Sequence, residues 1–209
     1  MMTIRDFHIY EPAHGHGLAH DPFNSIVGPR PIGWISSVDA HGRRNLAPYS
    51  FFNAFNYKPP IIGFASNGYK DTVRNIQAVG EFGWSLATLP LAERMNRSSA
   101  PVAPEVDEFE LAGLTPEPSR LIGVPRVAES PVSFECRLIE VHQLKTAAGQ
   151  PLDTWMTFGE VVAVHIDKAM LEDGLYLTAR AAPILRGGGP GDYFKITEEQ
   201  RFGMSRPTA

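Results

Sequence analysis

Residues that interrupt regular secondary structure recur along the whole chain, and they restrict the possible folds more than any other feature. Glycine accounts for 19 and proline for 18 of the 209 residues, well above the combined share of about 12% in an average protein. Proline lacks a backbone N–H donor and glycine weakens helix interiors, so a long helical bundle is excluded. Such a sequence favours many short strands joined by tight connections. The apolar fraction of 43% supports a folded core, and the length suits one domain.

Charge and cysteine content narrow the classes of partner and compartment. Lysine and arginine number 19 against 23 aspartate and glutamate residues, a net charge of −4, and the tightest basic pair is Arg43-Arg44. A nucleic-acid partner normally requires a basic stripe, so this class is not expected. Cys136 is the only cysteine, which excludes an intrachain disulfide and indicates a reducing compartment. Its apolar neighbours favour a small buried hydrophobe over a nucleophile.

The start of the chain predicts neither secretion nor membrane insertion. It lacks the pattern of a signal peptide, and no apolar run approaches the length of about 18 residues that a membrane span needs. We therefore expect a cytoplasmic protein without a membrane partner. Residues 1–22 predict an irregular N-terminal arm, and residues 23–209 a single domain. The arm contains His14, His16 and His20, but the ligand requirements of a metal favour a mobile or partner-wrapping segment over a metal site.

Hydrophobic periodicity predicts a barrel-like β domain with two short helices. The expected elements, in chain order, are strands over 32–38, 45–52 and 61–65, a helix over 71–79, a strand over 81–87, a helix over 90–95, and long strands over 132–144 and 155–166. The turn residues at 39–42 make the first two strands a hairpin. We expect Asp71 or Thr72 to cap the first helix and Gly80 to end it.

Two further segments are expected to be irregular. Residues 98–131 are rich in proline and acidic side chains, which predicts an extended surface excursion with one helical turn, and loops of this length are usually functional. Residues 185–193 contain Gly187-Gly188-Gly189-Pro190-Gly191, which is too rich in glycine for regular structure. No apolar helix follows this run, so it does not indicate a dinucleotide-binding fold.

The segment from Ser66 to Thr72 is the first of three candidate ligand sites. It leaves an apolar strand and enters an amphipathic helix. Free N–H groups and the positive end of the helix dipole favour an anion there, and Lys70 adds a full charge. An ordinary capped helix with a solvated lysine is the simpler alternative, and this segment alone favours it.

Two other candidate sites combine aromatic rings with small polar side chains. The segment 47–55 places both kinds at the end of a strand, as a planar heteroaromatic ligand requires, although a phenylalanine-rich core strand explains it equally well. In the segment 30–37, Trp34 could stack on a ligand and the serines could donate hydrogen bonds. Core packing of Trp34 is the simpler alternative.

Three motifs in this order and spacing closely resemble the flavin reductase-like FMN-binding family. They are Pro29-Arg30-Pro31-Ile32-Gly33-Trp34-Ile35-Ser36-Ser37, Asn45-Leu46-Ala47-Pro48-Tyr49-Ser50-Phe51-Phe52-Asn53 and Lys70-Asp71-Thr72-Val73-Arg74-Asn75-Ile76. The resemblance continues through shorter matches at 95–96, 107–114 and 125–131. It covers most of the chain, from about Asp21 to Tyr193.

The resemblance implies a mainly β fold, an FMN-binding split β-barrel with a few short helices. It also implies a homodimer with FMN near the subunit interface. By the same resemblance, the isoalloxazine and ribityl chain would contact Trp34, Ile35, Ser36, Ser37, Pro48, Tyr49, Ser50, Phe51 and Asn53. The phosphate would lie at the helix start, on Ser66, Lys70, Asp71 and Thr72, while Arg74 is one turn into the helix and could point to solvent.

The activity that the resemblance implies is FMN-dependent hydride transfer from NADH or NADPH to flavin. The flavin carries this chemistry, so no catalytic acid or base is assigned. Backbone N–H groups and the side chains of Ser50 or Asn53 could stabilise charge on the reduced flavin. A core or surface role is the simpler one for His142 and His165. The electron acceptor could be a small molecule or a monooxygenase partner.

Two alternatives remain open at this point. The first is an FMN-binding or flavin-storage protein on the same barrel, without NAD(P)H turnover. The second is a partner-binding β-barrel that uses residues 98–131 as its docking surface.

Overall fold

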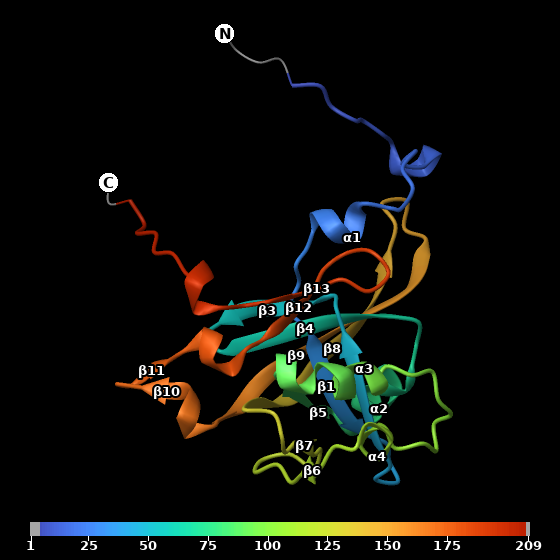
Figure 1. Cartoon of the computed structure of the whole chain (residues 1–209). Helices are drawn as coiled ribbons and strands as arrows, with labels where there is room; N and C mark the ends of the chain where they lie inside the picture. The colour runs from blue at the N-terminus through green and yellow to red at the C-terminus, as the bar shows by residue number, and fades with distance from the viewer. Residues whose placement is uncertain (1–4, 208–209) are drawn as a thin grey trace.

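An antiparallel sheet of seven strands organises the computed structural model, which describes residues 5–207. The strand order is β2-β1-β5-β8-β9-β4-β3 (Figure 1). These strands are β1 (Gly33–Val38), β2 (Arg44–Tyr49), β3 (Phe52–Tyr57), β4 (Pro60–Asn67), β5 (Glu81–Ser85), β8 (Val132–Lys145) and β9 (Pro151–Ile166). The helices are α1 (Phe23–Ile26), α2 (Asp71–Val79), α3 (Ala92–Arg97) and α4 (Glu108–Ala112).

The two edges of this sheet meet because the strands that form them are consecutive in the chain. β2 ends at Tyr49 and β3 begins at Phe52, and three Cα–Cα steps span at most about 11 Å. The sheet must therefore curl into a barrel, and Ala65 of β4 donates a hydrogen bond of 2.8 Å to the carbonyl of Phe51 at the corner. The prediction of a mainly β split barrel is confirmed. The predicted single strand over 45–52 is wrong, because the chain turns at Ser50-Phe51 to leave β1 and join β4.

Most other predicted elements are confirmed, with corrected boundaries. The hairpin of β1 and β2, the helix α2 and the long strands β8 and β9 all form, although β9 starts at Pro151 rather than 155. Gly80 ends α2 with a left-handed φ of 79°. The expected N-cap was wrong: Lys70 occupies that position.

Short elements complete the chain outside the barrel sheet. Strand pairs form between β6 (Pro116–Glu117) and β7 (Arg126–Val127), β10 (Leu171–Glu172) and β11 (Leu175–Tyr176), and β12 (Ile184–Arg186) and β13 (Tyr193–Lys195). The last pair flanks the glycine-rich run, so the prediction of no regular structure over 185–193 is wrong at its ends. The described turns of 3₁₀-helix are Pro12–His14, Leu89–Leu91, Lys168–Met170, Thr178–Ala181 and Glu198–Gln200.

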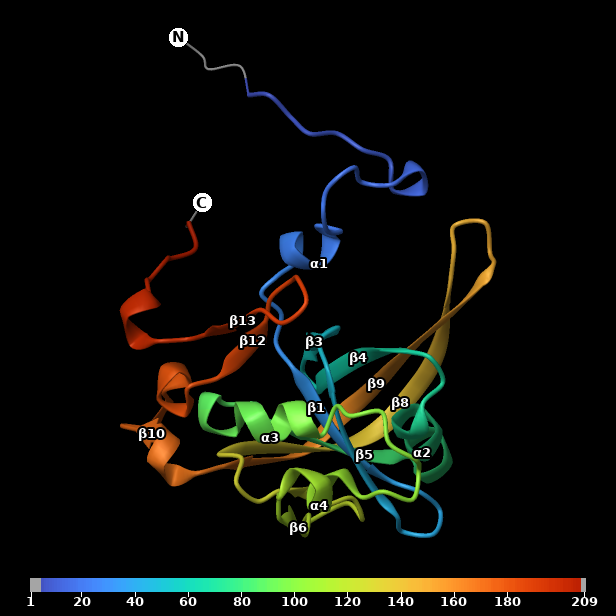
Figure 2. The ribbon, with the colours of Figure 1, turned by 45° about the vertical axis from the view of Figure 1, so that its right-hand side comes forward.

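The N-terminal segment leads away from the barrel beyond α1 (Figures 1 and 2). Residues 5–22 of the predicted arm are mostly exposed, and residues 1–4 lie outside the described part. His14 forms an ion pair of 3.3 Å with Glu11, and His16 accepts the N–H of Leu18 at 3.0 Å. No helix among residues 5–207 is long and apolar enough to cross a membrane.

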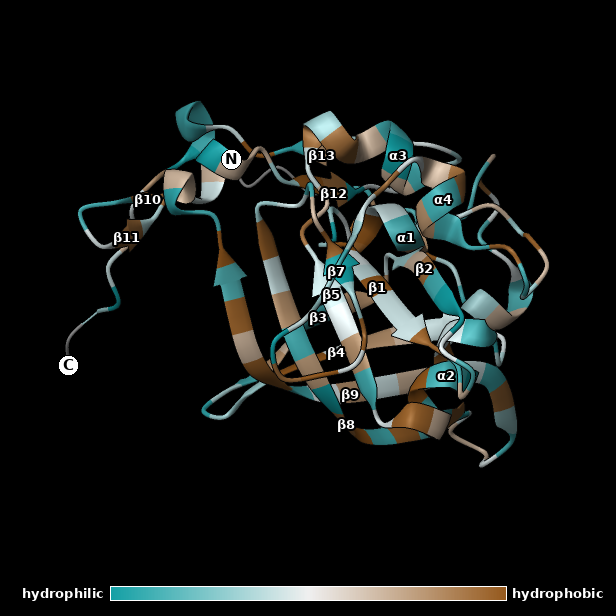
Figure 3. Cartoon of the chain, turned by 90° about the horizontal axis from the view of Figure 1, so that it is seen from below, coloured by the Kyte–Doolittle hydropathy of each residue, from teal (hydrophilic) through white to brown (hydrophobic). Residues whose placement is uncertain are grey.

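Strand β1, which lies between β2 and β5, is buried on both faces. Trp34 packs into one core cluster with Met95 and Phe109, while Ile35 packs into a second with Phe64. Hydrophobic and hydrophilic bands alternate along the longer strands β8 and β9 (Figure 3). Those strands have one face in the core and one toward solvent, whereas α3 and α4 cover the outer face of β1 and β2.

Helix α4 anchors the excursion 98–131 to the edge strand β2. Asp107 caps α4 by accepting the Phe109 N–H at 2.9 Å and accepts a hydrogen bond of 2.6 Å from Arg44 of β2. Glu108 accepts the backbone N–H of Leu46, also in β2, at 3.0 Å. Leu46 is fully buried, so this carboxylate satisfies an edge N–H group that has no strand partner.

Replacing Glu108 with alanine should lower the free energy of unfolding by about 1–3 kcal/mol, because the Leu46 N–H would stay buried without an acceptor. Urea denaturation measures this change. Glu110→Ala is the matched control, since Glu110 lies in the same helical turn but its side chain is 77% exposed. Equal losses in the two variants would contradict the role of Glu108.

A second buried carboxylate, Glu135 of β8, holds the loop before β7. It accepts the N–H groups of Arg120 and Leu121 at 2.7 and 2.6 Å, and it pairs with His165 at 2.5 Å. Burial disfavours its charged form, but these hydrogen bonds outweigh burial and lower the pKa of Glu135. The neighbouring Cys136 is fully buried, as predicted, and burial raises the pKa of its thiol.

The stabilisation by Glu135 should depend on pH. A carboxyl group with a lowered folded-state pKa stabilises the fold above its unfolded pKa of about 4.3, and this contribution fades as the pH falls through the folded value. Glu135→Gln should therefore be less stable than the wild type at pH 7, with a smaller difference at pH 3. Urea denaturation at both pH values tests this, with the exposed Glu140→Gln on the same strand as control. A difference that is independent of pH would refute the prediction.

Candidate functional site

The start of α2 presents backbone donors that the described chain leaves without acceptors. Lys70 is the N-cap residue and makes no side-chain capping bond. The first hydrogen bond of the helix runs from the Arg74 N–H to the Lys70 carbonyl, at 3.0 Å. Within residues 5–207, no acceptor lies in hydrogen-bond range of the N–H groups of residues 71–73. These groups and the helix dipole favour an anion.

Lys70 adds a positive charge beside these donors. Its side chain is exposed, and in the described part of the chain no carboxylate lies within 4.0 Å of its ammonium group. Gly68 precedes it with a φ of 94°, a conformation that favours glycine. The loop that carries Lys70 is held by a hydrogen bond of 2.8 Å from the Gly68 N–H to the carbonyl of Asp153 in β9.

Behind the helix start lies a buried cluster of polar side chains. Asn45 donates a hydrogen bond of 2.8 Å to the Thr72 hydroxyl, and Ser66 donates one of 2.8 Å to the carbonyl of Gly68. Burial raises the pKa of Tyr49, and its hydrogen bonds with Thr72 and Ser66 offset part of this shift. The structure thus brings together three predicted site residues from β2, β4 and α2. Their hydroxyl groups support the helix start from the buried side.

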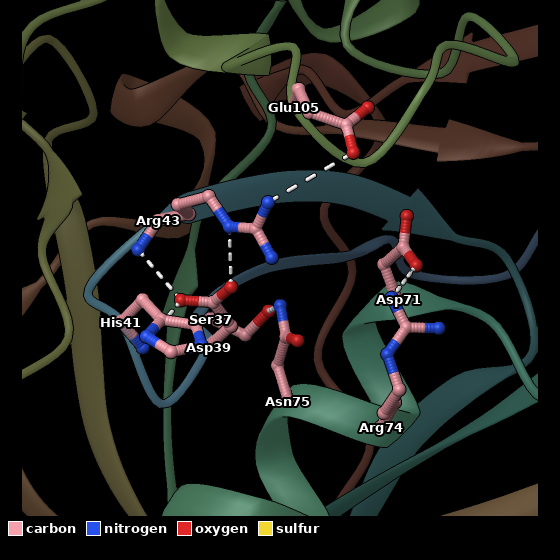
Figure 4. A network of polar contacts seen from close by, with 8 residues as sticks. All are labelled: Ser37, Asp39, His41, Arg43, Asp71, Arg74, Asn75 and Glu105. Atoms are coloured by element: carbon pink, nitrogen blue, oxygen red, sulfur yellow. Dashed lines mark hydrogen bonds and ion pairs between the residues drawn. The ribbon is translucent and has the colours of Figure 1, made fainter.

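A pocket beneath the β1–β2 turn is lined by charged side chains that neutralise one another (Figure 4). Arg43 pairs with Asp39 at 2.6 Å and with Glu105 at 3.9 Å, and Arg74 pairs with Asp71. Desolvation opposes ionisation of Asp39, but hydrogen bonds from the Arg43 backbone and side chain and from the His41 N–H lower its pKa to about 2. This pocket includes the first turn of α2, through Asp71, Arg74 and Asn75, and its arginines already have acidic partners.

The barrel corner contributes to a second pocket. Pro48, Tyr49 and Ser50 line it together with Ile32, Met95, Ser99, Arg186 and Tyr193. The predicted wall at the end of β2 therefore faces a pocket, as a ligand site requires. Arg186 and Tyr193 were not among the predicted residues. The glycine-rich run between them, which the sequence predicted to be irregular, is a signal that could have drawn attention to this place.

The remaining two residues of this predicted wall lie differently. The ring of Phe51 packs under the guanidinium of Arg30, 5.3 Å from the ring centroid. Asn53 lies on β3, where it is exposed and accepts the N–H of Ala54 at 2.9 Å. The structure therefore separates Asn53 from the pocket formed by Pro48, Tyr49 and Ser50.

The side chains of the four predicted residues of β1 are buried. Trp34 donates a hydrogen bond of 3.0 Å to the Ser98 hydroxyl, so core packing holds for its ring. Ser36 donates one of 2.6 Å to the carbonyl of Pro125, and Ser37 accepts a long one of 3.4 Å from Asn75. Ile35 lies in the core. The four side chains pack or hydrogen-bond within the chain, and their contact with FMN stays a prediction.

The histidines do not gather into a metal site. His165 is bound to Glu135 and His142 is exposed on β8. Across residues 5–207, the structure contains no group of three or more His, Cys, Asp or Glu side chains that could hold a metal ion.

Comparison with known proteins places these features in a family. Residues 28–185 match the model of the flavin reductase like domain. A curated relative is an uncharacterised protein of Aquifex aeolicus, 36% identical over 170 residues that cover 78% of this chain and 83% of the relative.

Two solved structures share both fold and sequence with the chain. One is nitrilotriacetate monooxygenase component B from Bacillus cereus, with a TM-score of 0.82, 30% identity and 98% of each chain covered. The other is the 2-nitrobenzoate 2-nitroreductase NbaA from Pseudomonas fluorescens, with a TM-score of 0.77, 30% identity and 89% of each chain covered.

Proposed function

Because the chain belongs to the flavin reductase-like family, we propose that it is an FMN-dependent oxidoreductase that uses NADH or NADPH as hydride donor. The observation that carries this proposal is the start of α2. Three N–H groups and the Lys70 ammonium, which have no partner among residues 5–207, form a receptor for a phosphate monoester, which FMN has and riboflavin lacks.

The residues around this receptor fit the rest of the cofactor. Tyr49 of β2 joins the two predicted regions, since its hydroxyl contacts Ser66 and Thr72 behind the helix start while the residue also lines the pocket at the corner. That pocket offers apolar surface from Pro48 and hydroxyl groups from Ser50 and Tyr49. Such a mixture is suited to a flat ring system with polar edges.

When bound, the flavin supplies the hydride chemistry. The protein then has to hold the ring and the nicotinamide in contact and to exclude water from between them. Pro48 and Tyr49 are held in place by strand β2. Ser50 lies in the barrel corner, where its carbonyl accepts a hydrogen bond of 3.0 Å from the Arg30 guanidinium. The rigid backbone of the corner positions the polar groups of Ser50. The proposed reaction needs this positioning and no catalytic acid or base from the protein.

We also propose a homodimer. The edge strand β3 and the long strand β8 carry exposed apolar side chains, among them Phe55 and Tyr57 of β3 and Ile139 of β8. In the proposed dimer, a second copy covers these side chains and completes the flavin site. The electron acceptor is proposed to be a small molecule or a monooxygenase partner, in line with the neighbour that is a monooxygenase component.

The purified protein, loaded with FMN and freed of excess, should show the absorption of an oxidised flavin. Anaerobic addition of NADH or NADPH should then bleach this absorption, since the hydride reduces the flavin. Stopped-flow absorbance with each donor measures the reaction. Free FMN at the same concentration is the control for uncatalysed reduction.

Two results would separate the alternatives. Flavin that binds but stays oxidised with both donors would favour a flavin-storage protein. A colourless protein that ignores added FMN would refute both flavin hypotheses and favour a partner-binding barrel.

Lys70→Ala should weaken FMN binding by about 1.5–3 kcal/mol, the range of a charge-assisted hydrogen bond. Riboflavin binding should not change, because riboflavin has no phosphate. Titration by quenching of flavin fluorescence measures both affinities. Lys168→Ala is the control, since Lys168 is an exposed lysine in the turn after β9. An equal loss for FMN and riboflavin would show that the phosphate does not lie on Lys70.

A further inference from the structure

Two arginines beside the corner pocket have no carboxylate within ion-pair distance among residues 5–207. Arg30 is buried and donates to three backbone carbonyls, those of Ser50 at 3.0 Å, Gly187 at 3.1 Å and Asn24. Arg186 likewise donates only to carbonyls, in the loop 188–192, at 2.9 to 3.0 Å. Over the described range 5–207, no carboxylate oxygen lies within 4.0 Å of either guanidinium.

The two charges lie close to one another. The backbones of Arg30 and Arg186 exchange two hydrogen bonds of 2.8 Å. Burial lowers the pKa of Arg30, and the charge of Arg186 lowers it further. Two neighbouring cations raise the local positive potential, which an anion from outside the chain would reduce. The charged pocket under the β1–β2 turn differs in this respect, because its arginines have acidic partners.

Arg186 lines the corner pocket, so the pocket itself has a positive electrostatic potential. The side chains of Ile32 and Met95 form apolar walls, and both are almost fully buried. Tyr193 lies under Arg186, with the guanidinium carbon 5.1 Å from the ring centroid. Ser99 adds a hydroxyl group. Apolar walls, an aromatic ring and a cation together suit a flat molecule with one negative group.

We propose that the corner pocket binds the anionic group of a small aromatic reactant, a carboxylate or a phosphate, with Arg186 as its charge partner. Arg30 acts behind it, by adding to the positive potential and by fixing the carbonyls of Ser50 and Gly187. The proposal rests on the proposed function in one respect: the flavin ring would lie against Pro48, Tyr49 and Ser50, and the reactant would lie beside it, against Arg186 and Tyr193 of the same pocket.

Benzoate and benzamide form the test pair, because they have nearly the same shape and differ in charge. Saturation-transfer NMR titration of the FMN-loaded protein should show benzoate binding at least about tenfold more tightly than benzamide, as a charge-assisted hydrogen bond implies. Added salt should reduce the difference. Phenyl phosphate, titrated in parallel, tells whether a carboxylate or a phosphate is preferred. A benzoate affinity no higher than that of benzamide, with phenyl phosphate equally weak, would overturn the proposal.

Three variants separate charge from loop structure. Arg186→Gln should abolish the preference for the anion, whereas Arg186→Lys, which keeps the charge but loses the planar fork, should retain most of it. Arg180→Gln is the control, because Arg180 is a half-exposed arginine paired with Glu172 at 2.5 Å. A preference that survives in Arg186→Gln, or that disappears equally in the glutamine and lysine variants, would overturn the role of the Arg186 charge. So would an Arg186→Gln variant that loses FMN affinity but keeps the anion preference.

The same titrations, repeated without FMN, separate this proposal from the proposed function. An anion preference that depends on Arg186 in a protein unable to bind FMN would support the pocket and refute the flavin function. A protein that binds FMN and is reduced by NADH, but shows no preference for the anion, would support the flavin function and refute the anion pocket.

Discussion

The closure of the sheet at Ser50-Phe51 is the constraint on which the rest of this structure depends. Two residues connect strands that lie at opposite edges of a seven-stranded sheet, so the sheet has to curl until those edges meet. The corner is held from two directions, by the Ala65 N–H on the Phe51 carbonyl and by Arg30 on the Ser50 carbonyl. The end of β2 thereby becomes the wall of a pocket instead of the middle of a longer strand.

Burial of side chains around this corner divides the predicted site residues into two groups. The side chains of β1, such as Trp34 and Ser36, bind other parts of the chain and fix the backbone. Lys70 stays free to meet a ligand at the start of α2, and Ser50 lines the corner pocket. A site that relies on positioning needs both groups, because it requires a rigid backbone more than reactive side chains.

Arginine plays two different parts in the molecule, and the difference lies in its partners. Arg43 and Arg44 have carboxylates within reach and serve to fasten the β1–β2 turn and α4 to the barrel. Arg30 and Arg186 bind carbonyls, which satisfy their hydrogen bonds but do not neutralise their charge. The first kind contributes to the fold, whereas the second leaves a positive potential next to the corner pocket.

The amino-acid sequence by itself determined the class of fold and the helix over 71–79, because alternation and helical period are local properties, and it marked the start of that helix as a candidate anion site. It also pointed to the segment at the end of β2. Only the tertiary structure decided that the strand over 45–52 breaks at Ser50, since that break follows from a pairing with β4, later in the chain. Likewise, Arg186 and Tyr193 join Pro48 only through folding. Whether an arginine has a carboxylate partner depends on residues that are distant in the chain, so the local sequence does not reveal it.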